Sequence, residues 1–83
     1  MNGVEIKRRQ NERKFGSWEP LPGGGRRYWY EVAGRGGRKA RYPKDVDAEE
    51  ETVRLWQEIY DEQGNLVEVH QKYPADLGHR RVR

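Results

Sequence analysis

The stretch TVRLWQEIYDEQGNLVEVHQKY, residues 52–73, decides the fold because it holds most of the strongly apolar residues of the chain. Its second half alternates between two faces. One face carries Val67, Val69 and Tyr73, and the other carries Glu68, His70 and Lys72. Alternation with a period of two, with β-branched residues on the apolar face, is typical of a strand. Residues 66–73 are therefore predicted to be a β-strand.

Two residues predict the turn before that strand. Gly64 suits the left-handed backbone position that closes a hairpin turn, and the Asp61 carboxylate can accept backbone hydrogen bonds at the start of the turn. Residues 60–66, Tyr-Asp-x-x-Gly-Asn-Leu, also resemble the hairpin of YD-type repeats. This resemblance covers only that short run and implies no function.

Residues 52–60 are compatible with two structures. Their aromatic and β-branched content favours a strand, which would complete a long hairpin with residues 66–73. In the alternative, Asp47 caps a helix with Glu50 three residues later, and Gly64 ends it. We favour the strand. The predicted fold class is mainly β, with a small α+β domain as the alternative.

Composition excludes several kinds of protein and site. The chain has 83 residues, enough for one small domain with a modest core, and 37% of them are charged. It has no cysteine, which excludes disulfides, and His70 and His79 cannot alone form a typical zinc site. No apolar run approaches the length of a membrane span. We expect no cofactor, metal or membrane partner, a cytoplasmic location, and a binding protein rather than an enzyme.

The charge is divided along the chain. Residues 1–44 carry twelve basic and four acidic side chains, a net charge of +8, whereas residues 45–83 carry five basic and ten acidic ones, a net charge of −5. Such asymmetry is typical of a surface that binds a polyanion. It is equally expected if the two halves pair as neighbouring strands with opposite charges.

Residues 1–25 are predicted to be a flexible basic arm that ends in a Gly/Pro linker. Residues 20–25, PLPGGG, provide the linker, and residues 7–14, KRRQNERK, form a charge run. The run is either a solvated tail or an arm that binds nucleic acid. Phe15 and Trp18 are exceptions, because aromatic residues in a tail usually dock. We expect them to pack across the sheet or to bind a partner.

Residues 26–83 are predicted to form a small sheet domain. Strands over residues 26–33 and 38–44 flank a glycine-rich turn, and the hairpin of residues 52–73 follows. Pro43 cannot donate to a strand ladder, so it is expected at a strand end or at an edge. The prediction is a four-stranded antiparallel meander of two hairpins, with a short basic tail over residues 79–83.

Cations beside aromatic residues make nucleic-acid binding the leading functional hypothesis. Cations neutralise phosphates, while exposed aromatic faces stack on unpaired bases. Residues 34–38, Gly-Arg-Gly-Gly-Arg, also resemble an RGG element. In the competing interpretation, the aromatic residues belong to the core and the arginines only keep the surface soluble. The predicted RNA- or DNA-binding residues are Arg26, Arg27, Trp29, Arg35, Arg38, Lys39 and Arg41.

A metal-independent ribonuclease of toxin type is the first alternative. Such chemistry needs a general base, a general acid and cations for the developing charge on the phosphate. Glu68 and His70 are two apart, so a strand places both on one face. Arg80, Arg81 or Arg41 would supply the positive charge. The pattern resembles small β-sheet toxin nucleases in general terms only.

A protein-interaction or homodimerisation module is the second alternative. An exposed strand edge, together with Phe15 and Trp18, would serve strand addition or a symmetric dimer. A nucleotide-binding enzyme is not indicated, because the chain has no P-loop and no G-x-G-x-x-G between a strand and a helix.

Overall fold

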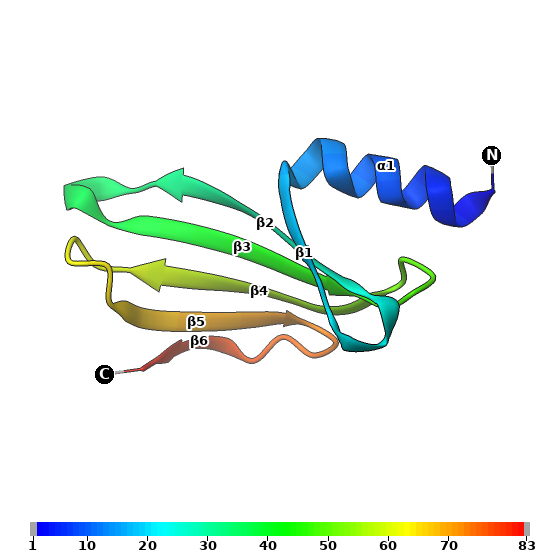
Figure 1. Ribbon diagram of the computed structural model, residues 1–83. Coiled ribbons are helices and arrows are strands. Elements are labelled where there is room, and N and C mark those ends of the chain that lie inside the picture. Colours follow the sequence, from blue (N-terminus) through cyan, green and yellow to red (C-terminus); the bar gives the residue numbers. More distant parts are fainter. Residues whose placement is uncertain (1, 83) are drawn as a thin grey trace.

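The computed structural model describes residues 2–82 and consists of one helix and one antiparallel sheet of six strands (Figure 1). The strands follow one another in the order β1 to β6, so the sheet is an uninterrupted meander. The elements are α1 (Gly3–Phe15), β1 (Ser17–Pro20), β2 (Arg26–Ala33), β3 (Lys39–Val46), β4 (Thr52–Tyr60), β5 (Leu66–Tyr73) and β6 (Gly78–Arg81), with short 3-10 turns η1 (Pro22–Gly24) and η2 (Arg35–Gly37).

The central hairpins are confirmed and the number of strands is corrected. Strands β2, β4 and β5 begin and end where the sequence predicts them. The helix considered for the segment of β4 does not form. The prediction of four strands is wrong, because β1 and β6 add one strand at each side of the sheet. Both added strands are only four residues long and largely exposed, so they lack the alternation that reveals a half-buried strand.

The prediction of a flexible arm is wrong for Gly3–Phe15, because this segment forms α1. The Asn2 side chain caps the helix by accepting from the Glu5 N–H at 2.8 Å, and Gly16 ends it with a φ of 78°. Glu5 lies in the first turn, with Arg13 and Lys14 in the last, which suits the helix dipole. These signals were present in the sequence, but the helix buries only one apolar side chain, so its apolar face is too narrow to recognise.

The buried core lies between the end of α1 and one face of the sheet. Phe15 packs against Tyr28, with ring centroids 5.9 Å apart, and against Tyr30 at 5.6 Å. Val46 completes the buried cluster. Phe15 therefore docks on the sheet as predicted, whereas Trp18 stays exposed on β1. We call this side of the sheet the helix face and the other side, which carries Trp29, the open face.

Pro43 occupies a place that the sequence did not predict. It lies inside β3, a central strand, where its Cα pairs with that of Trp29 on β2. On the β4 side, Arg41 pairs with Glu58 and Lys44 pairs with Leu55, whereas Tyr42 and Pro43 between them form no ladder pair. The missing N–H is thus tolerated because the ladder to β4 is interrupted there, while burial of the ring adds to the packing.

Candidate nucleic-acid interface

A buried carboxylate fixes α1 on the sheet. Glu50 lies in the turn between β3 and β4 with a φ of 64°, and its side chain is fully buried. The carboxylate accepts hydrogen bonds from the Tyr28 hydroxyl at 2.8 Å, from the Asn11 amide at 3.0 Å and from Arg8 Nε at 3.2 Å. Because two of these donors belong to α1 and one to β2, this contact sets where the end of the helix lies over the sheet.

Burial and hydrogen bonding act in opposite directions on this carboxylate. Burial alone raises the pKa of Glu50, but the hydrogen bonds from Asn11, Tyr28 and Arg8 outweigh it, so the pKa lies below its usual value of 4.5. Burial, with the hydrogen bond to Glu50, raises the pKa of Tyr28 to about 12. Glu50 is therefore an anion and Tyr28 a neutral donor at neutral pH.

Helix α1 covers only part of the helix face of the sheet, and a groove of about 210 Å³ opens beside the C-terminal end of the helix. Tyr30 and Tyr42 stack in this groove, with ring centroids 4.9 Å apart and ring planes inclined by 18°. Among the residues that the structure describes, no acidic side chain lines it. The tyrosine groove, as we call it, is lined by Lys14, Phe15, Tyr30, Tyr42, Leu55, Trp56 and Lys72.

Two ammonium groups, those of Lys14 and Lys72, line the tyrosine groove, and that of Lys44 lies near it and donates to Asn11 Oδ1 at 3.0 Å. Lys72 Nζ lies 5.5 Å from the ring centroid of Tyr42, and the Nζ atoms of Lys14 and Lys44 lie 5.4 and 5.8 Å from that of Phe15. Burial and then repulsion from Lys14 lower the pKa of Lys44, although Glu50 acts in the opposite sense. Positive charge is thus crowded here, and an anion would relieve the repulsion.

A row of side chains leads from the groove to the far edge of the sheet. Tyr30 pairs with Tyr42, whose hydroxyl accepts from Gln57 Nε2 at 3.0 Å. Gln57 pairs with His70 on β5, and His70 pairs with His79 on β6. Antiparallel partners lie on the same face, so the row crosses five strands on the helix face.

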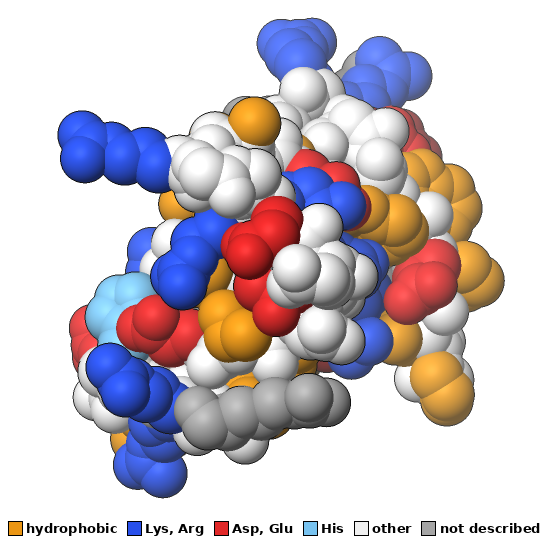
Figure 2. Space-filling view, turned by 90° about the vertical axis from the view of Figure 1, so that its left-hand side faces the viewer, with side chains coloured by type: hydrophobic (Ala, Val, Ile, Leu, Met, Phe, Trp, Pro, Cys, Tyr) orange, Lys and Arg blue, Asp and Glu red, His pale blue; other side chains and the backbone are white. Residues whose placement is uncertain are grey.

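The row ends in a pair of histidines. The ring centroids of His70 and His79 are 4.4 Å apart, with the rings inclined by 55°. His70 Nε2 lies 2.6 Å from Asp76 Oδ1, and His79 Nδ1 lies 2.5 Å from Glu68 Oε1. The Gly78 N–H, and then His70, lower the pKa of Asp76. Figure 2 views this end of the molecule and shows a histidine against acidic side chains, with Lys and Arg projecting around them.

Several of the predicted binding cations are paired with acids. Arg27 makes two hydrogen bonds to the Asp45 carboxylate, at 2.8 and 3.0 Å. Arg26 donates to Glu12 at 2.8 Å and its guanidinium covers Trp18 at 3.6 Å. Opposite charges on neighbouring segments therefore account for part of the charge asymmetry.

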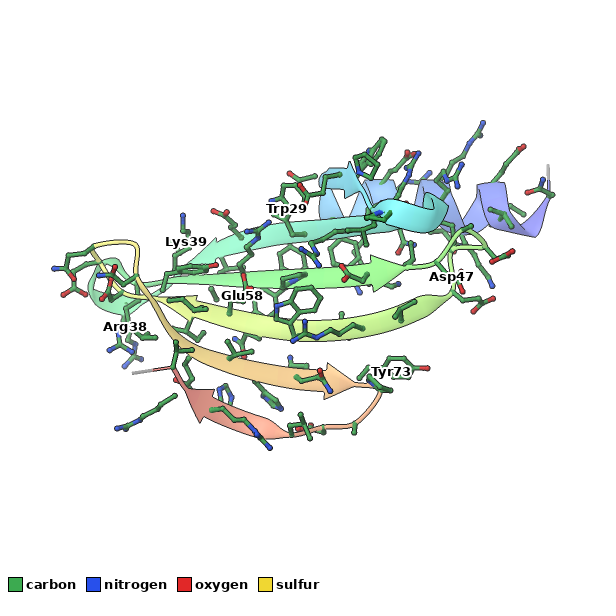
Figure 3. The ribbon with its side chains drawn as sticks, turned by 60° about the horizontal axis from the view of Figure 1, so that its bottom comes forward. Trp29, Arg38, Lys39, Asp47, Glu58 and Tyr73 are labelled. Atoms are coloured by element: carbon green, nitrogen blue, oxygen red, sulfur yellow. The ribbon has the colours of Figure 1, made fainter. Side chains whose placement is uncertain are left out.

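The other predicted residues lie on the open face or at the η2 turn. Trp29 is half-buried beneath Arg41, whose guanidinium carbon is 4.6 Å from the ring centroid, and Lys39 lies 3.2 Å from Glu31. Arg35 and Arg38 are exposed at the turn. Figure 3 shows Lys39 and Arg38 at one end of the sheet, with Trp29 further along it. The structure thus divides the predicted set among three surfaces.

The residues considered for a nuclease are partly brought together. Glu68 and His70 share the helix face, as the spacing predicts. Arg80 pairs with Val69 and so lies on the other face, whereas Arg81 pairs with Glu68. His79 was not among the predicted site residues, because its segment was taken as a tail. Pairing that segment back on β5 across the turn at residues 74–77 would have placed it beside His70.

Comparisons with known proteins found no significant match to a protein-family model, a curated protein or a solved structure. In residues 2–82 no helix is long and apolar enough to cross a membrane. The described residues also contain no group of three or more potential ligands that could hold a metal ion. Dimerisation stays a prediction. Function must therefore be inferred from the site itself.

Proposed function

We propose that this protein binds single-stranded nucleic acid in the tyrosine groove. The observation that carries the proposal is the juxtaposition of the stacked pair Tyr30–Tyr42 with two ammonium groups, in a groove that no described acid lines. These ammonium groups, of Lys14 and Lys72, form no ion pair within residues 2–82. Aromatic side chains that receive bases, beside cations that neutralise phosphates, are the features shared by proteins that bind single strands without strict sequence preference.

The charge distribution favours this surface over the one predicted from the sequence. On the open face, Arg27 and Lys39 already have carboxylate partners, and a phosphate would have to compete with them. At the groove, Lys14 and Lys72 form no ion pair with any of the described residues. A phosphate there gains attraction without breaking an existing ion pair, and this difference supports the helix face as the binding surface.

The shape of the groove favours single strands over duplexes. Its volume of about 210 Å³ accommodates one or two planar groups rather than a double helix. Bases in a duplex are stacked on one another and cannot offer a face to Tyr42. Unpaired bases can, and base–aromatic stacking contributes about 1–3 kcal/mol per base.

The test is a titration of labelled single-stranded RNA with the full chain, followed by fluorescence anisotropy at several salt concentrations. If Lys14 and Lys72 each contact a phosphate, a plot of the logarithm of the association constant against the logarithm of the salt concentration should have a slope of about −1.4, because each contact with a single strand releases about 0.7 counterion. Duplex RNA should bind more weakly. Absence of binding at low salt, or binding that salt does not change, would contradict the proposal.

A further inference from the structure

We propose that His70 and His79 act together to cleave RNA that lies in the tyrosine groove and continues along the helix face. This inference rests on the proposed binding function, and it adds a catalytic site at the β5–β6 edge of the sheet. The substrate class is single-stranded RNA, because the reaction uses the ribose 2′-hydroxyl. DNA would bind and remain intact.

The argument begins with the two imidazoles. They belong to paired residues on adjacent strands, and their centroids are only 4.4 Å apart. Each ring has one nitrogen held by a separate carboxylate, Asp76 for His70 and Glu68 for His79. A carboxylate in this position orients the ring and leaves the other nitrogen to exchange a proton with a substrate. A single imidazole beside a carboxylate is common on protein surfaces. Two such imidazoles in contact can serve one reaction, one as the base and the other as the acid.

The reaction needs no metal and no second reactant. One histidine, as the neutral base, accepts the proton of the 2′-hydroxyl while that oxygen attacks the adjacent phosphorus. The bond from phosphorus to the 5′-oxygen of the next nucleotide breaks, and the other histidine, as the imidazolium, donates a proton to the departing oxygen. The products are a 2′,3′-cyclic phosphate and a free 5′-hydroxyl, and the two histidines exchange protonation states.

Two cations stand near the histidines on the same face. Lys72 follows His70 by two residues along β5, about 7 Å away at the usual rise of a strand, and it also borders the groove. Arg81 on β6 pairs with Glu68. A phosphate between Lys72 and the histidines would have positive charge available for the negative charge that develops during attack.

The row of paired residues connects binding to cleavage. Gln57 joins the two sites, since its amide bonds the Tyr42 hydroxyl and its residue pairs with His70. A strand whose base stacks on Tyr42 would therefore carry a phosphate from the groove towards β5. The groups that face the histidine pair are Glu68 and Lys72 from β5, Asp76 from the turn, Arg81 from β6 and the uncharged Gln57 from β4.

The experiment incubates the full chain with end-labelled single-stranded RNA and identifies the products by mass spectrometry. Wild type should yield 2′,3′-cyclic phosphate ends, and the same oligonucleotide with a single 2′-deoxyribose should resist cleavage at that position. His70→Gln and His79→Gln should each lower the rate by about a hundredfold or more. The wild-type rate should show a bell-shaped dependence on pH that both variants lose.

Arg80→Gln is the matched control, because Arg80 neighbours His79 in the chain but lies on the opposite face. It should cleave like wild type, and identical purification of all variants controls for contaminating nucleases. Intact RNA with wild type, or equal cleavage by the His79→Gln variant, would overturn the histidine pair. Binding without cleavage would leave the groove proposal standing, whereas absence of both would overturn both.

Discussion

The phenolic oxygen of Tyr28 lies 2.8 Å from a carboxylate oxygen of Glu50, and this buried contact joins the sheet to the turn that also holds the helix. The same carboxylate accepts from Asn11 and Arg8 of α1. Since Phe15 at the end of α1 lines the tyrosine groove, the position of the groove depends on this contact. A small core makes such a polar contact more important, because few apolar side chains are buried.

Glu50→Ala should lower the free energy of unfolding by about 3 kcal/mol, because the Tyr28 hydroxyl and the Asn11 amide would remain buried without an acceptor. Urea denaturation followed by circular dichroism measures the change. Glu49→Ala, in the same turn and exposed, should change stability by less than about 0.5 kcal/mol. Equal effects of the two substitutions would show that the buried carboxylate does not hold the helix.

The backbone at Glu50 permits a second comparison. Its φ of 64° lies in the left-handed region, which costs an L-residue about 1–2 kcal/mol and costs glycine almost nothing. Glu50→Gly should therefore be more stable than Glu50→Ala by about 1 kcal/mol, again measured in urea. If alanine were the more stable of the two, the turn would not have this conformation in solution.

Acid should destabilise the fold through Glu50. Its pKa is below 4.5 in the folded protein, so the unfolded chain takes up the proton first as the pH falls. The stabilisation is complete above about pH 4.5 and is lost as the pH falls through the lower pKa of the folded state. Thermal unfolding from pH 6 to pH 2 measures this loss of stability. In the Glu50→Gln variant, the melting temperature should fall less over the same pH range.

Alkali should destabilise the fold through Tyr28. Its pKa is raised from 10.0 to about 12 on folding, so the unfolded chain loses the proton first as the pH rises. The stabilisation is complete below about pH 10 and disappears towards pH 12. Tyr28→Phe should lose stability at neutral pH but show a smaller further loss between pH 10 and 12. If the Tyr28→Phe variant lost as much stability between pH 10 and 12 as wild type does, another group would be responsible for the loss.

Lys14→Gln combined with Lys72→Gln should weaken RNA binding and reduce the steepness of its salt dependence by about 1.4, because two phosphate contacts are removed at about 0.7 counterion each. Lys39→Gln is the control, since Lys39 lies on the open face beside Glu31. Anisotropy titrations at several salt concentrations measure both. A larger loss in the Lys39 variant would move the interface to the surface predicted from the sequence.

Tyr42→Leu should cost about 1–3 kcal/mol of binding free energy, the usual contribution of one stacked base. Tyr60→Leu, also half-buried but on the open face, should bind like wild type. Circular dichroism establishes that both variants remain folded before the titration. Equal affinity of the two variants would show that bases do not stack in the tyrosine groove.

Local signals were sufficient for two strands of the central hairpins and favoured a third. Residues 26–33 and 66–73 combine β-branched and aromatic residues with well-marked turns, so their strands follow from the sequence. For residues 52–60 the same composition favoured a strand but left a helix as the alternative. The elements near the two ends of the chain, α1, β1 and β6, could not be predicted from the sequence. The helix has few apolar residues, and β1 and β6 are four-residue, largely exposed strands that pair with the outer sides of β2 and β5.

The candidate site was the less predictable part. The sequence correctly placed Glu68 and His70 on one face, because neighbours within a strand obey a period of two. It could not place His79 beside His70 or Tyr30 on Tyr42, since those contacts depend on the register between strands. A shift of one residue would move every side chain of a strand to the other face.

The sequence by itself therefore determined strands β2 and β5, the turns beside them and the charge asymmetry, all of which depend on residues close together in the chain, and it favoured a strand over a helix for β4. Only the tertiary structure decided which cations already have acidic partners and which border a groove. It also decided which face the helix covers. These properties depend on residues far apart in the sequence, where the packing of Phe15 and the buried carboxylate of Glu50 select one arrangement among many.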